Sequence, residues 1–269
     1  MTLPHPFDPT RAETRQQRLA HRLSAALAQG GLQVVYQPEV DVQTRQLTSL
    51  EALCRWQDPE LGTVAPDEFI AVAEARGHII ALGQYMWQQV LTDLPAIVAC
   101  WPEVRVAVNV SGVELSRPEF AANLSQRIGT SPAELARHLE LEVTESVFHH
   151  DVPTVRQQLQ TLRALGLTVA IDDFGTGQSS LSRLHLLPFD KIKMDRSFVQ
   201  ALDNPMTQAI IEAMVHLTRS FSKNLVVEGV ETPAQLEHLA QLGCKTVQGY
   251  VLSAPLALPQ LLAQSGKLY

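Results

Sequence analysis

Short runs of apolar and β-branched residues alternate with longer amphipathic stretches along most of the chain. Such runs between turn signals are typical of strands, and the stretches between them are long enough for helices that connect parallel strands. This alternation predicts an α/β fold with a mostly parallel, barrel-like sheet of about eight strands. The expected strands cover residues 32–37, 47–53, 105–109, 139–143, 168–171, 191–194, 225–227 and 246–249, and the clearest helices cover 67–76, 152–165, 207–222 and 233–242.

The first two predicted strands are joined by an unusually short segment. Only about nine residues, 38–46, separate them, whereas a connection between parallel strands needs a crossover of roughly a dozen or more. We therefore expect the first strand to run antiparallel to the second and the remaining strands to run parallel.

The N-terminal segment differs in composition from the rest of the chain. Residues 2–10 contain three prolines, and the charged stretch 11–29 ends at two glycines. This pattern predicts a linker and then a helix with its stop signal, so we assign residues 1–31 to a linker and helix and residues 32–269 to the barrel. The linker indicates that another domain precedes the barrel in a longer protein, although a free N-terminal tail fits the sequence nearly as well.

Composition excludes several classes of protein. With 269 residues, of which 45% are apolar and 18% charged, the chain has enough apolar material for one large core. The formal net charge of -7 argues against a long nucleic acid as partner, because that binding depends on Lys and Arg. Three widely spaced cysteines, without membrane-spanning or signal-like stretches, predict a reduced, cytoplasmic segment that makes no membrane contact, even if another domain anchors the full-length protein.

Polar residues follow the ends of most predicted strands. In a β/α barrel these ends converge on one mouth, where neighbouring carboxylates would repel each other by about 4 kcal/mol per pair at about 4 Å unless cations lie among them. Carboxylate and amide oxygens without His or Cys favour Mg²⁺ or Mn²⁺ over Zn²⁺, and the adjacent Asp172 and Asp173 indicate two ions. The alternative is that each acid caps a helix or pairs with a surface arginine. The set is Glu51, Asn109, Glu142, Asp172, Asp173, Asp195, Glu228 and Gln248.

A lysine is expected among these acids. Lys193 and Asp195 are two residues apart in the run that begins with the predicted strand 191–194, so strand alternation places their side chains on the same face. Lys193 could orient an attacking water and help to hold it deprotonated. A plain structural ion pair is the alternative.

The motifs together resemble those of the EAL domain family over residues 32–259. They are Tyr36-Gln37-Pro38, Glu51-Ala52-Leu53 followed by Arg55, Asn109-Val110-Ser111, Glu142-Val143-Thr144-Glu145, the run from Asp172 to Gly177, the run from Lys193 to Phe198, Glu228-Gly229-Val230-Glu231 and Gln248-Gly249-Tyr250.

The resemblance implies a modified (β/α)8 TIM-like barrel with an antiparallel first strand. It also implies a phosphodiesterase that opens the bacterial second messenger cyclic di-GMP to linear pGpG with two Mg²⁺ or Mn²⁺ ions, and that Ca²⁺ inhibits. Expected partners are a second copy of the chain, with the loop from Phe174 and the following helix near Leu181 to Leu187 at the contact, and an upstream sensory or GGDEF-type domain.

The resemblance further implies roles for individual residues. Lys193, Glu228 and Asp173 look catalytic, with Lys193 holding the nucleophilic water, and Glu145 looks like the acid that steadies the loop after Asp173. Gln37, Leu53, Arg55 and Gln248 look like substrate contacts. The expected metal-site residues are Glu51, Asn109, Glu142, Asp172, Asp173, Asp195 and Glu228.

The clearest departure from the family pattern is Gln178, where the family usually has Tyr, and it puts loop packing and dimer-linked control in question. Two other functions stay open: a receptor that binds cyclic di-GMP without cutting it, and a regulatory scaffold that binds no nucleotide. A different barrel enzyme, such as one acting on a sugar phosphate, also has acidic strand ends, but the set of Lys193, Asp195 and Gln248 argues against it.

Overall fold

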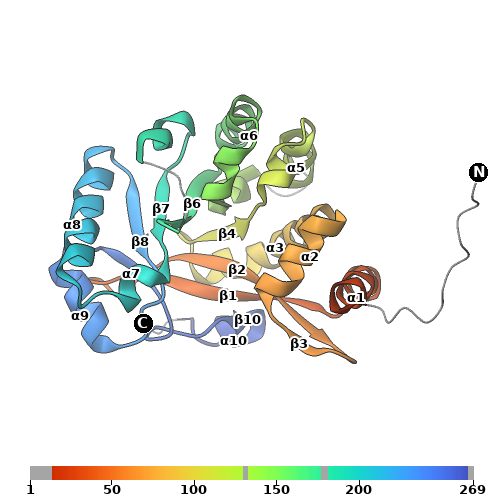
Figure 1. Cartoon of the computed structure of the whole chain (residues 1–269), viewed down its shortest axis with the longest axis horizontal. Coiled ribbons are helices and arrows are strands. Elements are labelled where there is room, and N and C mark those ends of the chain that lie inside the picture. Colours follow the sequence, from red (N-terminus) through yellow and green to blue (C-terminus); the bar gives the residue numbers. More distant parts are fainter. Residues whose placement is uncertain (1–13, 130–132, 177–180, 266–269) are drawn as a thin grey trace, which may run out of the picture.

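Eight strands form a closed barrel in this computed structural model, which describes residues 14–129, 133–176 and 181–265. The strands follow the order β1-β9-β8-β7-β6-β5-β4-β2, and pairing between β1 and β2 closes the ring. Figure 1 shows the helices arranged around this barrel. The barrel strands are β1 (Leu32–Asp41), β2 (Leu47–Asp58), β4 (Arg105–Asn109), β5 (Leu139–Thr144), β6 (Thr168–Phe174), β7 (Lys191–Met194), β8 (Asn224–Val227) and β9 (Thr246–Gln248).

The first strand has the direction that the short connection predicts. β1 runs antiparallel to both barrel neighbours, β2 and β9, whereas the other neighbouring pairs around the ring are parallel. The modified barrel is therefore confirmed. Several strands are longer than predicted, and two short antiparallel strands, β3 (Gly62–Val64) and β10 (Leu256–Ala257), were not predicted from the sequence.

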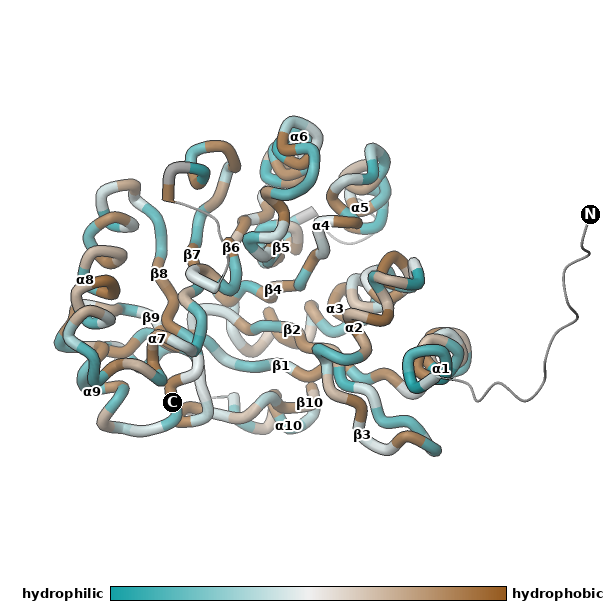
Figure 2. The backbone as a smooth tube through the Cα atoms, in the orientation of Figure 1, coloured by the Kyte–Doolittle hydropathy of each residue, from teal (hydrophilic) through white to brown (hydrophobic). Residues whose placement is uncertain are grey.

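Helices cover the outside of the barrel and show mixed polarity along their length, as in α5, α6 and α8 (Figure 2). Their apolar faces join one large hydrophobic core with the outward-facing residues of the strands. The long helix α3 was not predicted, and it contains Pro95. The helices are α2 (Pro66–Arg76), α3 (Ile79–Cys100), α4 (Gly112–Leu115), α5 (Phe120–Gly129), α6 (Val152–Ala164), α7 (Arg196–Gln200), α8 (Pro205–Ser220), α9 (Pro233–Gln241) and α10 (Leu258–Leu262), with 3₁₀ segments η1 (Ala133–His138), η2 (Glu145–His149) and η3 (Leu181–Leu186).

The N-terminal helix α1 (Arg15–Gln29) packs on the side of the barrel next to α2 (Figure 1). Leu19 and Leu23 are buried with Trp56 of β2 and Phe69 of α2 in a second hydrophobic cluster. The predicted helix is thus present, although its first residues, like the predicted linker at residues 2–10, lie outside the described part. The division of the chain at residue 31 stays a prediction. None of the helices in the described ranges is long and apolar enough to cross a membrane.

Candidate metal and active site at the barrel mouth

Strand alternation places the predicted acids on the inner face of the barrel. The parallel strands all end at the same mouth, and in β1, which runs the other way, Gln37 lies opposite Glu51. Residues two positions earlier on the parallel strands, such as Glu140 before Glu142 and Lys191 before Lys193, form a deeper layer. The barrel interior is therefore charged in two successive layers.

Lys193 lies at the centre of the mouth layer and has no exposed surface. Burial lowers the pKa of its ammonium, but four surrounding carboxylates raise it well above the ordinary value. Lys193 is therefore a buried cation. Its Nζ is 3.0 Å from Glu51 Oε2, 3.0 Å from Glu142 Oε1, 3.4 Å from Asp172 Oδ1 and 2.6 Å from Glu228 Oε1.

Glu51 is held as a carboxylate by three donors. Gln248 Nε2 donates to Oε2 over 2.8 Å, Asn109 Nδ2 donates to Oε1 over 2.9 Å, and Lys193 Nζ donates to Oε2 over 3.0 Å. Burial raises the pKa of Glu51, but Lys193 and the two amides outweigh it and lower the pKa to about 2. Glu51 therefore keeps its negative charge and a fixed orientation at neutral pH.

Three buried oxygens at the mouth meet no well-aligned hydrogen-bond donor among the described residues: Glu142 Oε1, Asp172 Oδ1 and Gln248 Oε1. Near the first two lies the ammonium of Lys193, at 3.0 Å and 3.4 Å. Burial and the neighbouring charge of Glu51 raise the pKa values of Glu142 and Asp172. Buried carboxylates are costly unless donors or cations bind them, and here four of them share a single ammonium.

The carboxylates form two groups in which the ligand atoms lie within 4.8 Å of one another: Glu51 with Glu142 and Asp172, and Asp172 with Asp173 and Glu228. Asp172 belongs to both groups. The donor set consists of oxygen atoms alone, which suits Mg²⁺ or Mn²⁺, and carboxylates that share one ammonium fit additional bound cations.

Asp173 has a strained backbone, with φ of 51°, at the point where the pairing register of β6 with β7 shifts. Burial and then the charges of Asp172 and Asp195 raise its pKa to about 6. Non-glycine residues in this conformation are concentrated at functional sites. The loop that follows is held by the Gly175 amide, which donates to Glu145 Oε1 over 3.3 Å, so Glu145 lies where the predicted loop-steadying role needs it.

Asp195 is placed differently from the other predicted metal-site residues. Its Oδ1 accepts a hydrogen bond of 2.9 Å from Ser197 N and so caps α7. It lines the mouth beside Asp173 and Glu228, but it is not in either carboxylate group. Gln178 lies outside the described residues.

Two cavities open at the mouth and share Glu51, Leu53, Asp67 and Asp173. One, of about 610 Å³, is also lined by the predicted substrate residues Gln37 and Gln248. The other, of about 370 Å³, is lined by Arg55, Asn109 and Asp172 together with apolar residues of α2 and α3. All four predicted substrate residues therefore face space that is next to the acids.

The sequence did not assign a role to two further mouth residues. Asp67 lines both cavities, and Tyr250, 67% exposed, lines the larger one. Asp67 directly follows Pro66 at the start of α2, where acidic residues are common because they interact favourably with the helix dipole. The sequence therefore gave no reason to assign Asp67 to the site.

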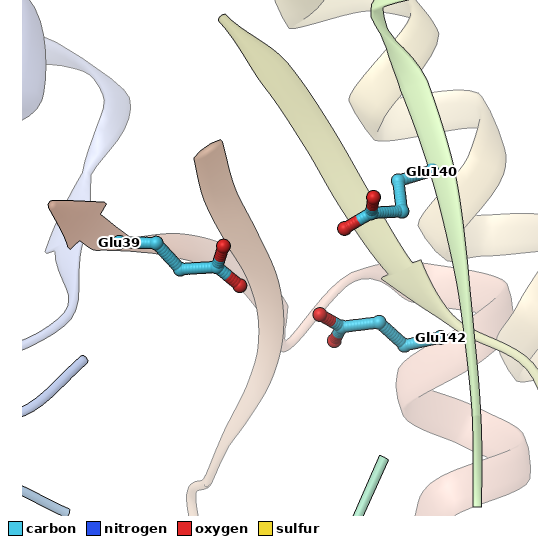
Figure 3. Close-up of side chains that lie close together, drawn as sticks. All are labelled: Glu39, Glu140 and Glu142. Carbon is cyan, nitrogen blue, oxygen red and sulfur yellow. The ribbon is translucent and has the colours of Figure 1, made fainter. Parts of the chain in front are cut away.

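The deeper layer was also missed. One oxygen each of Glu39, Glu140 and Glu142 lies within 4.8 Å of the others, and Figure 3 shows Glu39 pointing across toward the two glutamates of β5. Lys191 Nζ is 2.7 Å from Glu39 Oε2 and 2.6 Å from Glu140 Oε1. This layer therefore has its own internal cation. The signal was present in the sequence, because Glu39, Glu140 and Lys191 lie two residues from inward-facing positions of their strands.

Comparison with known proteins identifies the family. A model of the EAL domain matches residues 20–255. The chain belongs to the EAL domain family. One relative, the cyclic di-GMP phosphodiesterase NbdA of Pseudomonas aeruginosa, is 38% identical over 253 residues, which are 92% of this chain and 32% of NbdA. The oxygen sensor protein DosP of Escherichia coli is 34% identical over 262 residues, 95% of this chain and 32% of DosP. The chain spans about a third of the length of these curated relatives.

Solved EAL structures share the barrel. The PaMucR phosphodiesterase in complex with c-di-GMP superposes with a TM-score of 0.83 at 34% identity, covering 91% of this chain and 99% of that one. The EAL enzyme Bd1971, with cAMP and cyclic di-GMP bound, gives a TM-score of 0.87 at 29% identity and covers 94% of this chain and 70% of that one. The family and fold predicted from the motifs are confirmed.

Proposed function

We propose that this EAL domain hydrolyses one phosphodiester bond of cyclic di-GMP and releases linear pGpG, using two divalent cations, Mg²⁺ or Mn²⁺. The observation that carries the proposal is the convergence of four carboxylates on the single buried ammonium of Lys193, beside the mouth cavities. Support comes from the relative NbdA, which is a cyclic di-GMP phosphodiesterase, and from PaMucR, solved with c-di-GMP.

The metal-site residues divide into two sets around Asp172. Glu51, Asn109, Glu142 and Asp172 would hold one cation, and Asp172 and Asp173, helped by Glu228 and Asp195, would hold the other. Bound there, two cations would acidify a water molecule and offset the charge of the phosphate oxygens.

The remaining mouth residues position the reactants. Lys193 holds and orients the attacking water, while Gln37, Leu53, Arg55 and Gln248 bind the nucleotide. The water oxygen bonds to phosphorus, the bond from phosphorus to the 3′ oxygen breaks, and that oxygen takes up a proton. The product then carries a 5′ phosphate and a free 3′ hydroxyl.

The setting of the domain is part of the same proposal. The chain works in the cytoplasm beside further domains, as expected from relatives that are about three times its length. It pairs with a second copy through the segment after Phe174 and η3, where Leu181 is 53% exposed. Ca²⁺ competes for the site and inhibits.

The test is steady-state turnover of cyclic di-GMP with Mn²⁺ by the wild type and by Lys193→Met. Lys245→Met is the control, because Lys245 is an exposed lysine just before β9, at the end of the barrel away from the mouth. We expect Lys193→Met to lower kcat by about 10²–10⁴-fold, and the control to match the wild type.

Other outcomes separate the competing functions. Nucleotide that binds but stays intact with either metal would show a receptor. An absence of nucleotide binding would show a scaffold. Full turnover by Lys193→Met would contradict the assigned role of the lysine.

A further inference from the structure

The mouth acids share a single internal counterion. Within the described residues, Lys193 is the one cationic side chain that lies within 4.0 Å of Glu51, Glu142, Asp172 or Glu228. Because Lys193 is fully buried, water does not solvate its charge, and these carboxylates provide that stabilisation instead. The lysine and the acids therefore hold one another in place.

The ammonium of Lys193 contacts one oxygen of each of the four carboxylates that would hold the metal ions. It donates to Glu51 Oε2, and its closest contact, 2.6 Å, is with Glu228 Oε1. A carboxylate oxygen that accepts a hydrogen bond from an ammonium is a poorer ligand for a second cation, and two positive charges this close repel each other. Metal ions and Lys193 must therefore compete for this shell.

Lys191 provides the contrast within the same strand. It is also buried and contacts two acids, but these are Glu39 and Glu140 of the deeper layer. Its Nζ is not within 4.0 Å of any of the four mouth acids among the described ion pairs. β7 thus presents two buried lysines, of which one faces the metal-site oxygens.

We propose that Lys193 is a built-in counterion of the metal site. It keeps the four carboxylates converged before metal ions bind, and the ions displace it from part of that shell. Lys193 therefore weakens metal affinity, and after displacement it stays beside the ions, where the attacking water is held. This inference rests on the proposed metal site but not on the identity of the nucleotide.

The test is calorimetric titration of Mn²⁺ into the nucleotide-free protein. Lys193→Met keeps an unbranched side chain that is one atom shorter and removes its charge, and we expect it to bind Mn²⁺ at least tenfold more tightly than the wild type. Lys245→Met controls for net charge and should bind as the wild type does. Unchanged or weaker binding by Lys193→Met overturns the proposal.

Lys191→Met controls for loss of a buried lysine. If it tightens Mn²⁺ binding as much as Lys193→Met does, the effect belongs to buried positive charge in general, and the assignment to Lys193 fails. If the wild type binds no Mn²⁺, the proposed metal site itself is wrong. If the wild type and Lys193→Met both bind Mn²⁺ with equal affinity, the metal site stands and only the counterion proposal is wrong.

A nuclear magnetic resonance measurement on the wild-type protein tests the same proposal without any variant, so it does not depend on whether a variant folds. The ¹⁵Nζ resonance of Lys193 should shift when Mg²⁺ saturates the site, because the ammonium loses carboxylate contacts, while that of Lys191 should stay in place. A Lys193 resonance that does not respond to saturating Mg²⁺ would also overturn the proposal.

Discussion

Glu114 is a buried carboxyl group whose titration should be visible in the stability of the whole domain. It is 4% exposed, and its Oε1 lies so close to Gly83 of α3 that a Cβ there would be 1.9 Å away. Burial raises its pKa from 4.5 to about 7, with a further contribution from Glu74, although Ser111 N donates to Oε2 over 3.1 Å and opposes the increase. The folded chain therefore binds this proton more tightly than the unfolded chain.

The sign of the pH dependence follows from that difference. Between about pH 4.5 and 7 the folded state holds a proton that the unfolded state releases, so the free energy of unfolding falls as pH rises. Each pKa unit is worth about 1.36 kcal/mol, so ionising Glu114 in the fold costs on the order of 3 kcal/mol at pH 8. Glu114→Gln removes this cost and keeps the capping box with Ser111, because Gln serves at that position.

The assay is thermal unfolding of the wild type and Glu114→Gln at pH 5 and pH 8. We expect the variant to gain about 2 to 3 kcal/mol over the wild type between the two pH values, or about 5 °C at about 2 °C per kcal/mol for a chain of this size. Glu103→Gln, at an exposed acid, should show no such gain. An equal Tm difference between Glu114→Gln and the wild type at both pH values would refute the raised pKa.

Two further substitutions test the barrel interior and the loop at its mouth. Lys191→Met leaves Glu39 and Glu140 buried without their cation and should lower the free energy of unfolding by about 3 to 5 kcal/mol in denaturant titration. Adding Glu39→Leu and Glu140→Leu should restore it to within about 1 kcal/mol, and a triple variant as unstable as the single one would contradict this account. Gly175→Ala should cost about 1 to 3 kcal/mol in the same titration, because φ is 101° and its Cβ would lie 2.5 Å from the Phe198 ring; an unchanged midpoint would show that the loop adapts.

The elements that the sequence predicts most accurately are those in which the local residue pattern and the long-range geometry agree. The strand at Lys191–Met194 has the bounds that were predicted, because its short β-prone run ends at a polar residue that begins a helix. The antiparallel direction of β1 followed from the length of one connection. Strand ends such as that of β2, which continues through Arg55 to Asp58, were missed because polar residues there pair with β1 and β3 beyond the apolar run.

The sequence predicts which acids gather with Lys193 at the mouth but not their contacts, and the roles of these residues stay predictions. Alternation placed Lys193 in the mouth, yet the sequence paired it with Asp195. The structure instead surrounds it with acids from β2, β5 and β6 and with the residue that follows β8. Glu51 lies 142 residues before Lys193 in the sequence, and Glu228 lies 35 residues after it. The distances from these acids to Lys193 are therefore set only when the barrel closes. Likewise α3 carries apolar residues on much of its surface and has no capping side chain, so periodicity gave no clear start or end.

The most direct test of the proposed function is incubation of the purified chain with cyclic di-GMP and Mg²⁺ or Mn²⁺, with and without EDTA, and separation of the nucleotides by chromatography. The proposed two-cation hydrolysis predicts that pGpG appears with metal and not with EDTA. Cyclic di-GMP recovered intact with either metal, from a folded chain that binds Mn²⁺, would contradict it.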